Sequence, residues 1–197
     1  MATTINSVSS TSALSALSST LPANTTDIAT LTSDEIKALS ASEFSTLTTA
    51  QLQLIQPDAV PGISAAQFGA MPSGILAALT TDQVPQLTTA QIASLKNSQV
   101  QELKQTHLQV MSNAQVSNLT QSQIGSLTTL QITYLSTDQI SALTTSQVIS
   151  LTPLQVGALL PSQFGAMTGA QLSSLSTTQL VNVRDRKSTR LNSSHAN

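Results

Sequence analysis

The sequence predicts an all-α solenoid in which each eight-residue repeat forms one short helix of one to two turns. Three observations predict this fold class. A pair of apolar residues returns every eight residues, a Ser or Thr stands three residues before a Gln or Glu in most repeats, and several prolines directly follow that Ser/Thr position. The unit is clearest in residues 127–134, LTTLQITY, and it returns at 135–142 and 143–150.

The apolar pair keeps its register without an insertion from Ile28 to Val183. Its first member, the aliphatic position, recurs in steps of eight from residue 28 to residue 180, which makes twenty repeats. Its second member, the leucine position, follows three residues later, so the pattern has forty positions and every one of them is apolar. Because chance does not produce such a pattern, we interpret this region as a repeat array.

A period of eight excludes a single long helix. An α-helix turns about 100° per residue, so eight residues exceed two full turns by about 80°, and the apolar stripe would circle the helix within a few repeats. In a strand, the spacings of three and five would point the two apolar side chains to opposite faces of the sheet. A β-solenoid, whose Thr ladders would contact ice or a polysaccharide, is the alternative to the helical solenoid.

The Ser/Thr and Gln spacing predicts where each helix begins. The hydroxyl of Thr128 is expected to accept a hydrogen bond from the amide of Gln131, whose side chain reaches back to the amide of Thr128. The same capping box is expected in most repeats, and we call the place of Gln131 the glutamine position. Each box is expected to start a new helical turn that ends about five residues later, at the next leucine position.

Prolines and glycines modify this pattern. Pro57, Pro153 and Pro161 stand at the first helical position, where proline is favoured. Pro61 and Pro85 stand four residues further on, where an amide is normally bonded, so their repeats are expected to be shorter or distorted. Four glycines lie at the small positions of the repeat, where we expect the chain to bend or neighbours to approach closely; they are Gly69, Gly125, Gly157 and Gly165.

The stretch from Val60 to Leu79 is the least regular part of the array. Ala59 and Ile75 replace the consensus glutamine, and Pro72 replaces the consensus Ser or Thr. A bend or a weak point is therefore expected there.

Composition limits the classes of function. Only 8% of the 197 residues are charged, 2% are aromatic, and the net charge is −2, so no basic patch for nucleic acid is indicated. The absence of cysteine excludes disulfides and thiolate metal sites. No run of 18 apolar residues occurs, so no membrane insertion is expected. Evenly spread Leu, Ile, Val and Ala favour a thin, elongated core.

We divide the chain into three segments. Residues 1–24 are rich in Ser and Thr and lack the parts of a Sec-type signal peptide, so we expect a disordered leader. Residues 25–183 form the repeat array. Residues 184–197 end the register with a sudden run of charge, and the string DRKSTRLNSSH at 185–195 resembles the translation of a widely used sequencing adapter. We therefore expect this tail to be non-native and the natural chain to continue beyond it.

The sequence contains no constellation of catalytic, cofactor-binding or metal-binding residues. His107 occupies a glutamine position and is interpreted as a capping residue, and His195 lies in the suspected tail. Tyr134, at a small position, is expected to be a surface aromatic. With no paired base or converging ligands, neither a hydrolase triad nor a metal site is predicted, and the acids look scattered; they are Asp34, Glu35, Asp58, Asp82, Glu102 and Asp138.

The segment 79–95, LTTDQVPQLTTAQIASL, resembles repeats of large bacterial surface or secreted proteins of adhesin-, haemagglutinin- or haem-utilisation-like type. This resemblance implies a non-enzymatic spacer or stalk in adhesion, outside the cell or on its surface, although no haem ligand pattern accompanies it. Its partner would be a host or cell-surface protein or glycan, bound through a domain absent from this sequence. The alternative is an α-solenoid that binds a protein or peptide itself.

Overall fold

The computed structural model describes residues 28–72 and 74–183, which form short helices joined by tight connections. The described residues contain no strand, so the all-α prediction is confirmed and the β-solenoid alternative is wrong. The expected leader 1–24 and tail 184–197 lie outside the described residues. The α-helices are α3 (Ser33–Ala38), α4 (Ala41–Ser45), α5 (Thr49–Leu54), α6 (Ala65–Ala70), α7 (Thr89–Ser94), α8 (Asn97–Gln101), α9 (Gln105–Val110), α10 (Asn113–Ser117), α11 (Gln121–Ser126), α12 (Thr129–Tyr134), α13 (Thr137–Ser141), α14 (Thr145–Ser150), α15 (Pro153–Ala158), α16 (Pro161–Gly165) and α17 (Gly169–Ser174).

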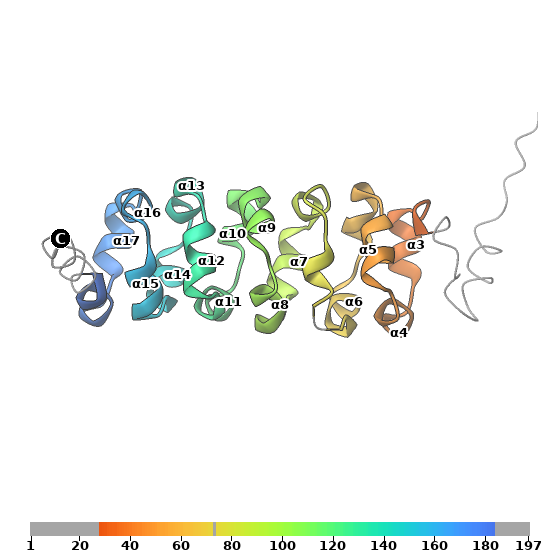
Figure 1. Ribbon diagram of the computed structural model, residues 1–197, viewed down its shortest axis with the longest axis horizontal. Coiled ribbons are helices and arrows are strands. Elements are labelled where there is room, and N and C mark those ends of the chain that lie inside the picture. Colours follow the sequence, from red (N-terminus) through yellow and green to blue (C-terminus); the bar gives the residue numbers. More distant parts are fainter. Residues whose placement is uncertain (1–27, 73, 184–197) are drawn as a thin grey trace, which may run out of the picture.

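Three successive repeats make one coil of the solenoid. Helix α11 contacts α8 on one side and α14 on the other, and these helices begin 24 residues apart, at Asn97, Gln121 and Thr145. The same spacing relates α9, α12 and α15, and also α10, α13 and α16. Figure 1 shows the coils following one another along the long axis of the molecule, with the described ends at opposite ends of the rod. The sequence period of eight did not reveal this number of repeats per coil.

Each described α-helix from α3 to α17 begins directly after the Ser/Thr position, and its C-cap is the leucine position or the residue before it. In α11, the amide of Gln123 donates to the hydroxyl of Thr120 (3.2 Å), and the amide of Thr120 donates to Oε1 of Gln123 (2.6 Å). The helix ends at Leu127, whose amide donates to the carbonyl of Ile124 (3.2 Å) and whose backbone is already extended. The capping box therefore starts a helix, and the leucine position ends it.

Three repeats form 3₁₀-helices instead of α-helices. They are η1 (Pro57–Gly62), η2 (Leu76–Ala78) and η3 (Val84–Gln86). Pro61 lies inside η1 and Pro85 inside η3, and neither can donate the backbone hydrogen bond of an α-helix. The distortion expected at these two prolines is confirmed, and Pro57, Pro153 and Pro161 begin their helices as predicted.

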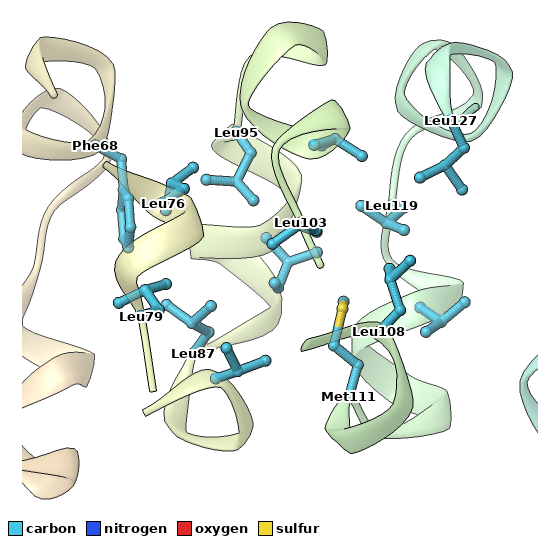
Figure 2. Packing of buried hydrophobic residues seen from close by; sticks show 14 of the residues in the cluster. Phe68, Leu76, Leu79, Leu87, Leu95, Leu103, Leu108, Met111, Leu119 and Leu127 are labelled. Carbon is cyan, nitrogen blue, oxygen red and sulfur yellow. The ribbon is translucent and has the colours of Figure 1, made fainter. Parts of the chain in front are cut away.

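The core is a single column of aliphatic side chains along the axis. From Ile28 to Val156, residues at the aliphatic position are at most 1% exposed, and the leucine position lines the interior beside them. Figure 2 shows Phe68, Leu76 and Leu108 meeting leucine-position side chains in the interior. Burying about 25 cal/mol per Å² of apolar surface in every coil is what stabilises helices too short to persist alone.

Two expectations about single residues need correction. Tyr134 is not a plain surface aromatic: it is half-buried and packs against the core at the end of α12. Among the four glycines singled out, only Gly125 and Gly157 lie against a neighbouring coil, at Ser150 and Asn182, whereas a methyl group at Gly69 or Gly165 would meet open space. The closest approach is at Gly62, which the repeat pattern had not marked.

Candidate functional site

The main polar feature of the described interior is a set of buried side chains at the glutamine position, all of them glutamine except His107. A glutamine or histidine at the glutamine position is at most 6% exposed from Gln67 onward. We call this set the glutamine ladder, and its members are Gln67, Gln83, Gln91, Gln99, His107, Gln115, Gln123, Gln131, Gln139, Gln147, Gln155, Gln163, Gln171 and Gln179. A buried polar side chain requires hydrogen-bond partners, so each member has to be accounted for.

Gln123 shows how the ladder is bonded. Its Oε1 accepts the amide of Thr120, which is the capping bond within its own helix. Its Nε2 donates to the carbonyl oxygens of Leu95 (2.6 Å) and Ile92 (3.0 Å), which belong to the preceding coil. One side chain therefore caps the start of its own helix and the end of a helix in the preceding coil.

The same two donor bonds recur through the ladder. Gln67, Gln83 and Gln171 each donate from Nε2 to carbonyls 31 and 28 residues earlier, at 2.6 to 3.0 Å. The first of these carbonyls also accepts the amide of the C-cap residue, as Ile36 does from Leu39 (3.3 Å), and the second lies at the helix end, where backbone acceptors lack partners within the helix. The side chain must combine an acceptor with a donor, so a primary amide fits and a carboxylate does not.

The sequence pattern predicted the capping half of this arrangement but not the bonds between coils. One feature of the sequence does point to the bonds between coils. Acids occupy the glutamine position only at Asp27, Glu35 and Glu43, the first three repeats of the array, and none occurs there from Gln51 onward. This restriction of acids to one end of the array points to a second role for the amide elsewhere.

Some repeats lack part of the arrangement. Ala59 and Ile75 replace ladder glutamines, and their repeats form the 3₁₀-helices η1 and η2. The irregular stretch from Val60 to Leu79 thus has 3₁₀-helices on both sides of α6. Lys96, Lys104 and Leu160 stand where Ser or Thr is usual and have no side-chain acceptor, so only their own amides are capped, by Gln99, His107 and Gln163.

His107 is a member of the ladder, as its position predicted. Its Nδ1 accepts the amide of Lys104 (3.3 Å), and its Nε2 lies 2.9 Å from the carbonyl oxygen of Leu79 in the preceding coil. Only the neutral ring protonated at Nε2 satisfies both contacts. Burial lowers the pKa of His107 below its usual value, as does the nearby Lys104 charge, while the Leu79 carbonyl acts in the opposite direction.

This geometry predicts a pH dependence of stability. Because the folded-state pKa of His107 is depressed, the unfolded chain binds a proton more readily once the pH falls below about 6.5. We expect the free energy of unfolding to be fully retained above that pH and to decrease below it, by up to about 1.4 kcal/mol per pH unit for this one group. Urea denaturation between about pH 5 and pH 7.5 measures the slope.

The variant His107→Gln is the matched control for this prediction. It restores the residue that the ladder uses elsewhere, with both an acceptor and a donor, but without a titrating ring. We expect the variant to lose the slope near pH 6 and to remain folded. An unchanged slope in the variant would show that other groups, and not His107, cause the pH dependence.

The titratable groups do not converge on a reaction centre. In the described residues, no group of three or more His, Asp or Glu side chains could hold a metal ion. Asp34, Asp58 and Asp82 are not scattered as expected. They are exposed, stand 24 residues apart, and occupy one position of the repeat on successive coils. This row is part of the solvated surface, at or near helix starts that favour negative charge.

Exposed apolar side chains are unevenly distributed. Leu130 on α12 and Leu154 on α15 are 59% and 69% exposed. They are 24 residues apart, and their helices are in contact, so they lie on one side of neighbouring coils. The part of the chain that the structure describes has no helix long and apolar enough to cross a membrane.

Comparison with known proteins identifies the repeat but not its role. Residues 60–97 match the family model of the ALTTAQ repeat. No curated protein and no solved structure matches the chain significantly. The matched segment spans η1 to the start of α8, which is slightly more than one coil and a half of the array. The chain is therefore a repeat-containing protein with short helical repeats.

Proposed function

We propose that the array is a non-enzymatic spacer in a bacterial secreted or cell-surface protein, where it holds a binding domain away from its point of attachment. The observation that carries the proposal is the uniform junction between coils. Each described coil repeats the same aliphatic contacts, and from Gln83 onward each repeat adds a ladder bond to the preceding coil, so the number of coils sets the length. Ladder amides engaged in structural bonds leave little polar chemistry in the interior for a substrate.

We base the proposed cellular location and the proposed role in adhesion on the sequence of the repeat. The LTTxQ unit resembles repeats of large adhesin-like proteins, and the exposed positions are mostly Ser, Thr, Ala and Gln. The low charge and the lack of cysteine are compatible with exposure outside the cell. In this proposal, the host or cell-surface partner is bound by another part of the protein.

A spacer should shorten by a fixed step when one coil is removed. Deleting residues 121–144 joins Thr120 to Thr145 and keeps the eight-residue register. Because neighbouring helices pack about 8–10 Å apart, we expect the maximum dimension to fall by about 10 Å with the helical content per residue unchanged. Small-angle X-ray scattering and circular dichroism measure the two quantities.

A twelve-residue deletion of 121–132 is the control, because it removes half a coil and breaks the register. That variant should lose ordered structure on the C-terminal side of the junction instead of shortening by a step. If removing a whole coil collapses the particle, or leaves its maximum dimension unchanged, the spacer proposal fails.

A protein- or peptide-binding solenoid is the second candidate, and the exposed pair Leu130 and Leu154 favours it. The whole-coil deletion also separates the two candidates, because it removes Leu130 and the pairing of the two side chains. If the array is a spacer, the deletion leaves the binding activity of the whole protein intact and only shortens the distance between the binding domain and its point of attachment. A solenoid that binds through this side loses that activity.

A further inference from the structure

One side of the solenoid differs chemically from the other two. The elements α3, η1, η3, α9, α12 and α15 contact one another in this order, so they form one column along the rod. Figure 1 shows α3, α9, α12 and α15 following one another in that direction. In each of these repeats the residue directly before the glutamine position is exposed, and these residues stand 24 apart. We call them the mixed row; they are Asp34, Asp58, Asp82, Thr106, Leu130 and Leu154.

The other two columns carry small residues at the same position. From Ser42 to Ala170 these residues are serine, alanine or glycine, with Asp138 as the exception. A helix start favours an acid on any side of the rod, so the helix dipole does not explain why three successive coils carry one in the same column. A uniform spacer does not require a distinct side either. The mixed row therefore indicates a surface that meets a partner.

The first half of the mixed row is acidic. In the part of the chain that the structure describes, Asp34, Asp58 and Asp82 are exposed and form no ion pair. Their three repeats also contain Glu35 and Lys37, so four acids stand against one lysine and the net charge of these repeats is −3. Such a row repels nucleic acid and anionic lipid, and it attracts a cationic segment of a partner.

The second half of the mixed row is apolar. Leu130 and Leu154 are 59% and 69% exposed, and they lie on the contacting helices α12 and α15. Val110, at the end of α9 in the same column, is 36% exposed. A partner that covers these side chains removes neighbouring apolar surfaces from water, which favours binding. The row thus combines an acidic half with an apolar half.

The spacing of the mixed row selects the conformation of the partner. Neighbouring coils pack about 8–10 Å apart, so the five steps from Asp34 to Leu154 span about 40–50 Å. A polyproline II segment returns to the same side at every third residue, after about 9.3 Å, which matches one step. Seven residues of an α-helix rise about 10.5 Å and would leave the register over five steps. An extended segment therefore fits the row better than a helix.

We propose that this side of the rod binds an extended segment of a partner protein. Basic side chains at every third residue of the segment meet Asp34, Asp58 and Asp82, and apolar side chains at the same spacing cover Leu130 and Leu154. The repeat array of a second copy does not supply such a segment, because residues 28–183 contain no arginine and only three lysines, no two of which are three residues apart. The inference rests on the second candidate function, the binding solenoid, and is independent of the spacer role.

A synthetic peptide tests the proposal on the full chain. The probe is a fluorescently labelled peptide of about 16 residues, with lysine at every third position of one half, leucine at every third position of the other half, and proline and serine between them. It is made with the basic half first and with the basic half last, so that both directions along the rod are covered. Fluorescence anisotropy should show saturable binding of one of the two peptides, weakened by salt. The same peptides with glutamate in place of lysine should not bind.

Substitutions in the mixed row should separate the contributions of its two halves. The variant D34N/D58N/D82N should bind the peptide about tenfold more weakly at low ionic strength and lose most of the salt dependence. The variant L130A/L154A should also bind about tenfold more weakly, but it should keep the salt dependence. Circular dichroism verifies that both variants, whose altered side chains are exposed, keep their helical content.

Matched controls change the same chemistry on the other two columns. Asp138→Asn on α13 removes an exposed acid, and Ile149→Ala on α14 shortens a side chain that is 60% exposed. Each should change the affinity by less than about twofold. The proposal is overturned if neither peptide binds, if the glutamate peptides bind equally well, or if the controls weaken binding as much as the row variants. Such a result leaves the spacer proposal intact, because that proposal depends on the length of the deletion variant.

Discussion

Replacing Gln123 by Glu should lower the free energy of unfolding by about 3–5 kcal/mol at neutral pH. Gln123 is 1% exposed, and its Nε2 lies 2.6 Å from the carbonyl oxygen of Leu95. In the variant a carboxylate oxygen takes that place, so a buried charge faces two carbonyls and no donor remains. Urea denaturation followed by far-ultraviolet circular dichroism measures the loss.

The reverse exchange at the start of the array is the matched control. Glu43→Gln changes the same atoms, but Glu43 has no described coil before it and is only half-buried. We expect a change of less than about 0.5 kcal/mol. The damage at Gln123 should also be partly relieved at acidic pH, where the introduced carboxyl binds a proton and regains one donor. Equal effects at positions 43 and 123 would contradict the role assigned to the ladder.

Replacing Gly62 by Ala should destabilise the array by about 3 kcal/mol. Gly62 is buried in η1, and a Cβ atom there would collide with the backbone carbonyl oxygen of Ser33 in the coil before it. Because the obstacle is backbone and not the tip of a flexible side chain, the two coils must separate to accommodate the methyl group. Thermal and urea denaturation both report the change.

Gly69→Ala tests whether the effect belongs to the close approach or to glycine in general. Gly69 lies in α6 with no atom within 4 Å of an added Cβ, and its backbone is not in the left-handed region. Alanine is favoured over glycine in a helix, so we expect this variant to be more stable by up to about 1 kcal/mol. If both substitutions change stability in the same direction, the explanation for Gly62 is wrong.

Local features of the fold were predictable because they depend on a few neighbouring residues. The capping box of Thr128 and Gln131 spans three residues, so sequence spacing was sufficient to place the start of α12. The number of repeats per coil depends on the direction the chain takes at each extended C-cap, such as Leu135. Small differences in backbone angles, summed over three repeats, decide that number, and the residue types at the C-cap do not encode it visibly.

The ladder was only half predictable for a related reason. The capping bond of Gln123 joins residues three apart, whereas its bonds to Ile92 and Leu95 join residues 31 and 28 apart. The longer bonds can be inferred only once the number of repeats per coil is known. Gly62 was missed because sequence alone does not distinguish it from Gly69, although the first touches another coil and the second faces open space.

The relation between an eight-residue repeat and a 24-residue coil has a consequence for how such genes can change. Gain or loss of one repeat preserves every capping box and core contact type, yet it turns all downstream residues by a third of a turn about the axis. Surface features aligned on one side, such as Asp34, Asp58 and Asp82, survive only changes in multiples of three repeats. The fold therefore tolerates the gain or loss of single repeats. If one side of the solenoid has a function, selection should instead favour changes of three repeats at a time.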